Sequence, residues 1–273
     1  MMITDPRFIA FNREAELAKR LACSGVTALR KATPSRSGIY YDAFFGISNA
    51  LERFAKLAWL IDECIQRNGA FPTDQDLRAV GHDIEALIKK ATLIASKHGQ
   101  SQPFPSDDIT DHIVKFLSAF SVRTRYYNID FFVGGKSIGM GDPIKTWHAK
   151  VGAAILTMPE MKAKQQRRQA QAQQVATLMS PAIVFSTSAQ GTSLSTVAEL
   201  SLSESEAKEI NKQAQWKLLT VVRYLCLLII DLAGAAQAAS HSFIPDMREH
   251  LGFFCADDAI LRRYATWPPR GIA

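Results

Sequence analysis

Cysteine is scarce in this chain of 273 residues, and none of its four cysteines forms a C-x-x-C pair. Zinc knuckles and thiol-redox sites need such close spacing, so both are excluded. Two of the four lie within apolar helical patterns, which indicates buried, reduced thiols rather than a disulfide framework. We therefore expect a reducing, cytoplasmic environment for the four residues Cys23, Cys64, Cys226 and Cys255.

An uninterrupted apolar segment is also absent from the N-terminal region, where acidic residues come early, so we expect no secretory signal. The most membrane-like run is residues 218–239, but it contains Arg223 and Asp231. Charged side chains are costly at membrane depth. We therefore expect this run to be the central core helix of a bundle, and the protein to have no membrane partner.

No catalytic motif is complete in this sequence. The run G-G-K-S at 134–137 has Asp130 where a phosphate-binding P-loop has its first glycine, and no helix is expected directly after it. We interpret the run as a glycine turn. The sequence has no H-E-x-x-H, and the loose spacing of His241, His250 and Cys255 is not typical of a metal site. We expect neither a metal nor another cofactor.

The composition and periodicity of the chain predict an all-α protein. Apolar residues make up 47% of the chain and charged residues 21%, which is typical of a globular protein with a large core. Apolar side chains recur at steps of three and four, as on one face of a helix. The predicted helices span residues 7–31, 39–67, 73–98, 107–127, 143–180 and 204–239. Their short connections favour an antiparallel helical bundle.

One segment interrupts the helical pattern. Residues 181–203 carry a single charge and many serines and threonines. Two runs around A-Q-G predict a small β-hairpin near 183–200, although the composition also fits a disordered linker. Ser203 and Glu206 then have the spacing of a capping box, which predicts the start of the last long helix. We expect a single domain made of a bundle over 1–180, the linker or hairpin, and C-terminal helices over 204–273.

Positive charge is concentrated in one part of the chain. Residues 121–175 contain nine Lys/Arg and three Asp/Glu, whereas the segments before and after them are nearly balanced. Such a cluster attracts polyanions. The alternative is a solvated, Lys/Arg-rich helix face that binds no ligand.

The stretch S-V-R-T-R-Y-Y-N-I-D, at the start of this basic segment, has the residue types of an RNA-binding surface. Guanidinium groups bind phosphates with two hydrogen bonds, and tyrosine rings stack on unpaired bases. An amide can bind a base edge or a ribose hydroxyl. The residues concerned are Arg123, Arg125, Tyr126, Tyr127, Asn128 and, after the glycines, Lys136.

The same stretch also has a purely structural interpretation. Arg125 would then pair with Asp130, and Asn128 would cap the helix before the glycines. The two tyrosines would fill the edge of the bundle.

Two of the predicted helices carry a family resemblance. The first contains F-F-G-I-S-N-A-L-E-R-F-A-K, and after a proline loop the next contains L-R-A-V-G-H-D-I-E-A-L. Over about residues 39–130 the chain resembles the HEPN superfamily, whose members often combine an l-E-x-x-x-K element with a following H-D-l element. The matching residues are Leu51, Glu52, Lys56, His82, Asp83, Ile84 and Leu87.

The resemblance implies an up-down helical bundle and a class of activity. HEPN domains are often dimeric, and many are metal-independent RNases of toxin–antitoxin, phage-defence or stress systems. The usual HEPN active motif, an arginine followed four to six residues later by a histidine, is missing. Arg78 and His82 have only three residues between them, and no histidine follows Arg123 or Arg125 before His148.

We therefore hypothesise a HEPN-like RNA-binding protein that acts as a metal-independent endoribonuclease. His82 is the leading candidate for proton transfer, because an imidazole ionises near neutrality. The expected partners are RNA, a second copy of the chain and a protein such as an antitoxin. The alternative is a non-catalytic module for dimerisation or protein interaction. The hypothesis assigns catalysis to His82, Arg125 and Asn128, and substrate binding to Arg123, Tyr126, Tyr127 and Lys136.

Overall fold

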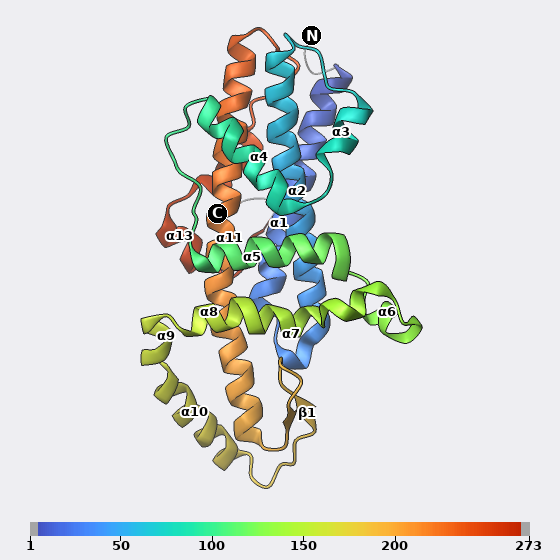
Figure 1. Ribbon diagram of the computed structural model, residues 1–273. Helices are drawn as coiled ribbons and strands as arrows, with labels where there is room; N and C mark the ends of the chain where they lie inside the picture. Colours follow the sequence, from blue (N-terminus) through green and yellow to red (C-terminus); the bar gives the residue numbers. More distant parts are fainter. Residues whose placement is uncertain (1–4, 269–273) are drawn as a thin grey trace.

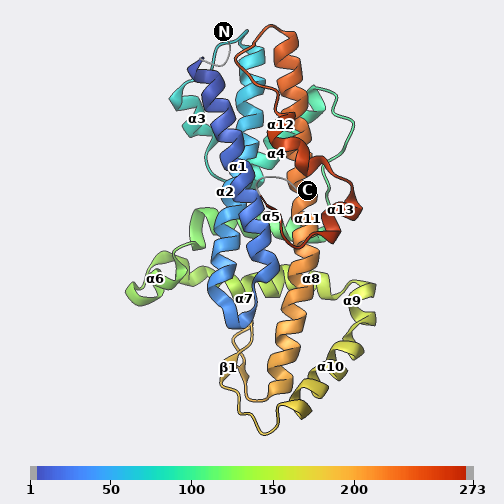
Figure 2. The ribbon, with the colours of Figure 1, turned by 180° about the vertical axis from the view of Figure 1, so that it is seen from behind.

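Three long helices form the centre of the fold in a computed structural model that describes residues 5–268. They are α1 (Pro6–Lys31), α2 (Ser37–Gln66) and α11 (Val197–Ala238). The three helices lie side by side along an elongated molecule, and α1 runs antiparallel to the other two (Figure 1, Figure 2). Their facing side chains contribute most of one apolar core. The all-α class with a small β-hairpin is confirmed.

The backbones of α1 and α2 meet at a pair of glycines. A Cβ atom on Gly25 would lie 2.7 Å from the Ile47 nitrogen, and a Cβ atom on Gly46 would lie 2.9 Å from the Gly25 Cα. Real Cβ atoms do not approach so closely, so only glycine fits at either position without a shift of the helices. The contact continues in both directions through the buried alanines Ala18, Ala22, Ala43 and Ala50.

The predicted start of the last long helix is wrong. α11 begins at Val197, where Glu199 N donates to Thr196 Oγ1 at 3.2 Å and Thr196 N donates to Glu199 Oε2 at 3.0 Å. Ser203 and Glu206 have the same spacing but lie inside the helix. Residues 197–203 are therefore helical rather than part of a linker, and the second capping-box signal lies inside a helix that has already begun.

α11 is long and apolar enough to cross a membrane by length and composition alone. In the fold, 72% of its most apolar window is buried inside the protein. Arg223, within this helix, binds Asp258 at 2.7 Å and donates to the Ala256 carbonyl at 3.0 Å. The charge that interrupts the apolar run thus attaches the C-terminal segment to the bundle.

The helix predicted over residues 73–98 is two helices. α3 (Asp74–Val80) begins with a cap at Thr73, where the predicted helix starts, and ends at Gly81, whose φ is 73°. Asp83 then caps α4 (Ile84–Lys97). The apolar stripe continues through both helices, so the periodicity alone did not indicate the break; a left-handed glycine followed by an N-cap residue produces it. His82 therefore lies between two helices and not on one.

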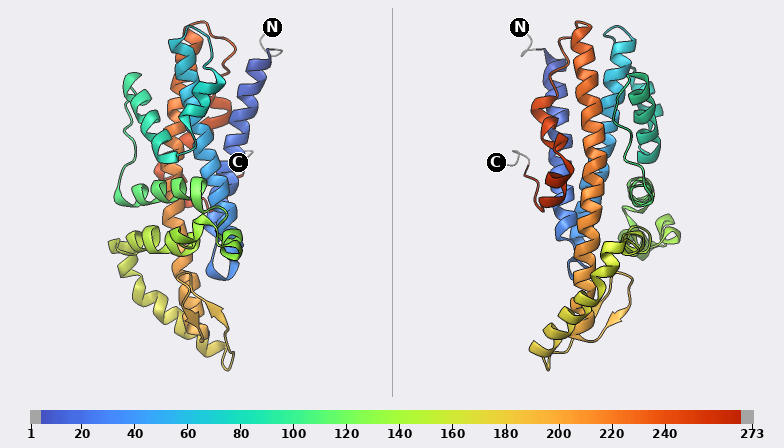
Figure 3. Two further views of the ribbon diagram at one scale, coloured as in Figure 1. Left: turned by 45° about the vertical axis from the view of Figure 1, so that its right-hand side comes forward. Right: turned by 90° about the vertical axis from the view of Figure 1, so that its left-hand side faces the viewer.

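The helix predicted over residues 107–127 is also interrupted. α5 (Asp108–Ala119) is capped by Asp107, and it leads into a π-helical turn, η3 (Phe120–Thr124). A π turn holds more residues than an α turn, so the residues after it point in a different direction. α6 (Tyr127–Val133) projects from the side of the bundle and ends at a left-handed Gly134, before η4 (Lys136–Met140) (Figure 1, Figure 3).

A layer of shorter helices crosses the three long ones (Figure 1). The helix predicted over 143–180 is broken, because a π turn follows its first helix and Pro159 lacks the N–H that would continue the second. The Gln/Ala-rich α10 is mostly exposed and packs on α11 through Arg168 and Ala172. The elements are α7 (Pro143–Trp147), η5 (His148–Gly152), α8 (Ala153–Leu156), α9 (Pro159–Ala163) and α10 (Gln165–Leu178).

The predicted hairpin is present around A-Q-G. β1 (Ser186–Thr187) pairs antiparallel with β2 (Ser193–Leu194). After α11 the chain packs on the back of the bundle as α12 (Arg248–Leu251), η6 (Gly252–Cys255) and α13 (Asp258–Arg263) (Figure 2). All four cysteines are free thiols, as expected.

A buried polar network joins the crossing layer to α2 and α11. Asn211 donates to the Tyr40 hydroxyl at 3.1 Å, and that hydroxyl lies 2.7 Å from Nε2 of His148. Trp147 Nε1 donates to Asn211 Oδ1 at 3.2 Å. Because the tyrosine oxygen already accepts from Asn211, its proton is available to Nε2 of a neutral imidazole.

Replacement of Gly46 by alanine is expected to lower the free energy of unfolding by about 1–3 kcal/mol, because the added methyl group forces the two backbones apart. Urea unfolding followed by circular dichroism measures the change. Gly234→Ala is the matched control, because Gly234 lies within α11 with open space around its Cα. This control should be neutral or stabilising by up to about 1 kcal/mol. Equal losses in both variants would contradict the role given to the glycine contact.

Burial lowers the pKa of His148 to about 4. The unfolded chain therefore binds a proton at higher pH than the folded protein, and the free energy of unfolding falls as the pH drops from about 6.5 toward 4. We expect His148 to contribute up to ~3 kcal/mol to this fall. Urea unfolding at pH 7.5 and pH 4.5 should show a pH-dependent loss about 2 kcal/mol smaller in His148→Gln than in the wild type. Identical losses would contradict this assignment.

Candidate functional site

A cleft of about 210 Å³ lies beside the middle of α2. It is bordered by α2, by the junction of α3 and α4, and by η3 with the residue that follows it. The cleft brings together His82 and Arg125, the imidazole and the guanidinium on which the nuclease hypothesis depends. Its other lining residues are Phe45, Ser48, Asn49, Glu52, Phe120, Ser121 and Val122.

The loop that carries His82 is attached to α5 through the neighbouring Asp83. The Asp83 carboxylate accepts from the Ser118 hydroxyl at 2.7 Å and from the Ala86 nitrogen at 3.1 Å. The hydrogen bond from Ser118, followed by that from Ala86, lowers the pKa of Asp83, so this anchor is ionised near neutrality. The backbone of His82 is thus held in place while its side chain stays 74% exposed.

Glu52 orients the imidazole of His82. Nδ1 of His82 lies 2.8 Å from Glu52 Oε1, and Lys56 Nζ donates to the same oxygen at 2.8 Å. Nδ1 also lies 3.5 Å from Lys56 Nζ, which only donates, but the contact with Glu52 is much shorter. A carboxylate only accepts, so this shorter contact places the proton on Nδ1. In the neutral ring, Nε2 then holds the free lone pair. This is the tautomer that a general base requires.

Arg125 supplies a positive charge to the cleft. Its guanidinium carbon lies 5.0 Å from the centre of the Tyr126 ring, and it forms no ion pair with any residue from 5 to 268. The alternative pairing with Asp130 is not formed; one oxygen of Asp130 instead accepts from the Ser137 nitrogen at 3.1 Å. The guanidinium is therefore free to bind an anionic ligand.

Arg123, Tyr126, Tyr127 and Lys136, which we predicted to bind substrate, lie outside the cleft lining. Tyr127 is half-buried and the other three side chains are exposed. They form part of the surface around η3, α6 and η4, so any contact with a ligand would be made beyond the cleft.

Asn128, which we predicted to be catalytic, is not among the residues that line the cleft. Its side chain is exposed on α6. Any contact of Asn128 with a ligand would therefore also be made outside the cleft.

The sequence did not identify Ser48, Asn49 and Ser121 as members of the site. Ser48 and Asn49 lie four and three residues before Glu52, so both share a helix face with Glu52 on α2. A polar row at this spacing on an otherwise apolar helix is a signal that can be found in the sequence. Glu52 itself was noted only as the partner of Lys56 and as part of the HEPN resemblance.

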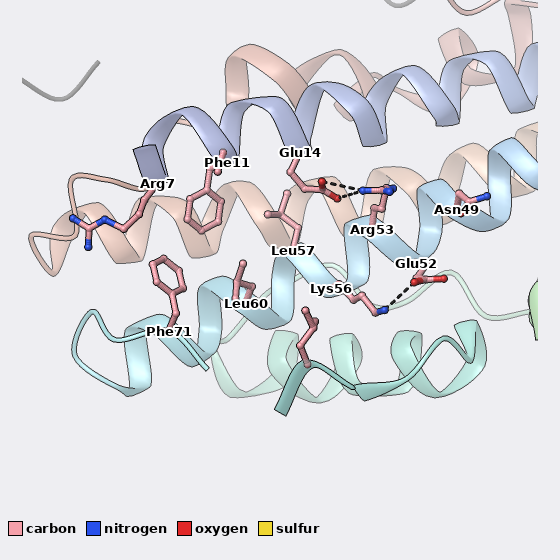
Figure 4. A pocket seen from close by; sticks show the side chains of 12 residues that line it. Arg7, Phe11, Glu14, Asn49, Glu52, Arg53, Lys56, Leu57, Leu60 and Phe71 are labelled. Carbon is pink, nitrogen blue, oxygen red and sulfur yellow. Dashed lines mark hydrogen bonds and ion pairs between the residues drawn. The ribbon is translucent and has the colours of Figure 1, made fainter. Parts of the chain in front are cut away.

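A larger chamber of about 600 Å³ adjoins the cleft (Figure 4). It lies between α1, α2 and α3, and Asn49 and Glu52 line both spaces. His82 can therefore transfer a proton and Arg125 can bind an anion in the cleft, while a neighbouring part of the same ligand occupies the chamber. Among residues 5–268, no three His, Cys, Asp or Glu side chains are grouped to hold a metal ion.

A scan against protein-family models and searches of curated proteins and of solved structures each found no match. The resemblance of residues 39–130 to HEPN domains therefore stays a prediction.

Proposed function

We propose that this protein is a metal-independent endoribonuclease whose reaction takes place in the cleft beside α2. The observation that supports the proposal most strongly is that His82 and Arg125 line one cleft, with the imidazole held by Glu52. These groups come from three separate parts of the chain. A proton-transfer group and a cation free to bind phosphate are the minimum that RNA transesterification needs.

In the proposed reaction, Nε2 of His82 takes the proton from a ribose 2′-hydroxyl. The 2′-oxygen forms a bond to phosphorus while the bond from phosphorus to the 5′-oxygen breaks, and water protonates the leaving oxygen. Arg125 binds the non-bridging oxygens, where negative charge increases in the transition state. Glu52 stabilises the imidazolium ion that forms.

The charge distribution along the chain favours a polyanionic substrate. Residues 121–175 carry the basic excess of the chain, and Arg125 belongs to this segment. Long-range attraction would raise the rate at which RNA meets the cleft. A role in a defence, toxin–antitoxin or stress system, with a protein inhibitor as partner, belongs to the same proposal through the HEPN resemblance.

The wild-type protein is expected to cleave single-stranded RNA in the presence of a chelator. His82→Ala and Arg125→Ala should each lower kcat/KM by about 10²–10⁴-fold, because they remove proton transfer and charge stabilisation. Labelled oligonucleotides resolved on gels measure the rates. A single 2′-deoxy nucleotide at the cleaved bond should abolish cleavage there.

Matched controls separate chemistry from charge and folding. His112→Ala removes a histidine outside the cleft and should not change the rate. Arg123→Ala removes a neighbouring arginine outside the cleft and should at most raise KM. Full activity of His82→Ala, or dependence of cleavage on a divalent metal, would refute the proposed mechanism.

A second function, self-association, is favoured by the surface of α6. None of its seven residues is buried, and its apolar side chains Ile129, Phe131, Phe132 and Val133 are 65%, 63%, 86% and 75% exposed. Exposed apolar side chains in such a cluster mark interaction sites. In a two-fold dimer each α6 would cover the same residues of the other copy, so apolar surface would meet apolar surface.

The protein is expected to be a dimer at micromolar concentration, and Phe132→Glu should convert it to a monomer, because a charge replaces the most exposed ring of α6. Size-exclusion chromatography with light scattering measures the mass. Leu93→Glu is the control, because Leu93 is 72% exposed on α4, away from α6. A monomeric wild type would rule out this second function.

A further inference from the structure

The chamber beside the cleft has no part in the proposed reaction apart from Glu52, which lines both spaces. Its volume of about 600 Å³ is in the range of small-molecule sites. Its walls come from α1, α2 and α3, together with Phe71 from the loop between α2 and α3. It is open to solvent and therefore accessible to a ligand.

The chamber is apolar at one end and polar at the other. Figure 4 shows Phe11 and Phe71 at the end near Arg7, and Asn49 and Glu52 at the opposite end. Leucines contribute the apolar surface between and around the two rings: Leu57, Leu60 and Leu77.

The charged side chains of the chamber neutralise one another. Arg53 binds Glu14 with one nitrogen at 2.7 and 2.9 Å, and Lys56 binds Glu52 at 2.8 Å. At the outer end, a guanidinium nitrogen of Arg7 lies 2.8 Å from a carboxylate oxygen of Asp5. The guanidinium carbon of Arg7 lies 3.9 Å from the centre of the Phe243 ring. The chamber therefore suits a neutral group with a flat or apolar body, and not a phosphate.

The chamber and the cleft form successive parts of one groove along α2. The cleft uses α2 residues 45–52, the chamber uses α2 residues 49–60, and Asn49 and Glu52 belong to both. A ligand with a phosphate at Arg125 would therefore place the next part of its structure at Asn49, at the polar entrance of the chamber. The order along the groove is thus an anion site, a proton-transfer group and a neutral pocket.

We propose, on the premise of the nuclease function, that the chamber holds one unpaired nucleobase of the RNA strand bound in the cleft. A base is a flat, neutral ring with polar edges, and it is joined to the phosphate by a ribose. Its faces would contact the apolar walls, and its edge would meet the polar groups at the Asn49 end. The substrate is therefore single-stranded RNA or a loop, because a base-paired nucleotide cannot enter a chamber on one side of its strand.

To test the proposal, a tryptophan is introduced at an exposed position so that its side chain fills the chamber. Ala10 lines the chamber on the exposed side of α1, so Ala10→Trp should block the space without disturbing the core. Ala170→Trp makes the same change at an exposed position of α10, far from the chamber. Circular dichroism verifies that both variants fold, and Leu77→Trp fills the chamber from α3 as a second variant.

The first measurement uses free nucleosides and no catalysis. Saturation-transfer NMR with adenosine, guanosine, cytidine and uridine should detect binding of at least one nucleoside to the wild type and to Ala170→Trp. Ala10→Trp and Leu77→Trp should weaken that binding by about tenfold, the scale of one lost base stack. Absence of nucleoside binding to the wild type, or equal binding to all four proteins, would overturn the proposal.

The second measurement uses RNA cleavage. In the wild type, an abasic nucleotide next to the cleaved bond should lower kcat/KM about tenfold, whereas Ala10→Trp should cleave the normal and abasic strands at the same reduced rate. If the wild type cleaves both strands equally, the base chamber is wrong and the nuclease stands. If the wild type cleaves neither strand but binds nucleosides in the chamber, the binding site stands and the nuclease is wrong.

Discussion

The close approach of α1 and α2 at Gly25 and Gly46 is the constraint on which the rest of the structure depends. With no side chain between the backbones at this point, the two helices are in direct contact there. They diverge toward the N-terminal end of α1 (Figure 3). Bulky side chains such as Phe11 and Leu57 occupy the wider end without filling it, and the chamber is the space that remains. A tight contact at one end of a helix pair thus creates a binding-sized hollow at the other.

The same helix α2 serves three surfaces at once. One stripe of α2, which includes Phe44, Ile47 and Leu51, is in the core. The polar row of Ser48, Asn49 and Glu52 lines the cleft. Side chains that follow Glu52 line the chamber. Glu52 lies where the last two meet and is held by Lys56 on its own helix. Because α2 packs against both α1 and α11, the carboxylate that orients His82 is attached to the centre of the core. A site on such an element keeps its geometry when a ligand binds.

Aromatic packing sets the other wall of the cleft. The centre of the Phe44 ring lies 4.6 Å from that of Phe116, 5.4 Å from that of Phe120 and 5.2 Å from that of Trp147. These contacts join α2 to the crossing layer. Phe120 is fully buried and also lines the cleft, so the core extends to the base of the site. The π turn begins at this residue and directs the chain that follows it, including Arg125, to the rim. The position of the cation is therefore coupled to core packing.

Local sequence patterns by themselves determined the helical class, the extent of α1 and α2, the Thr73 cap, the hairpin at A-Q-G and the region of excess positive charge. Each depends on residues within a few positions of one another, and apolar spacing is sufficient for that. Only the tertiary structure decided the break at Gly81, the π turn at Phe120 and the choice of Thr196 over Ser203 as a cap. In these cases the local sequence is compatible with more than one outcome, because the apolar stripe continues past Gly81 and because Thr196 and Ser203 have the same capping-box spacing. Tertiary structure alone also placed Glu52 against His82 and Arg125 in the same cleft, because no local pattern encodes a contact between residues on separate helices.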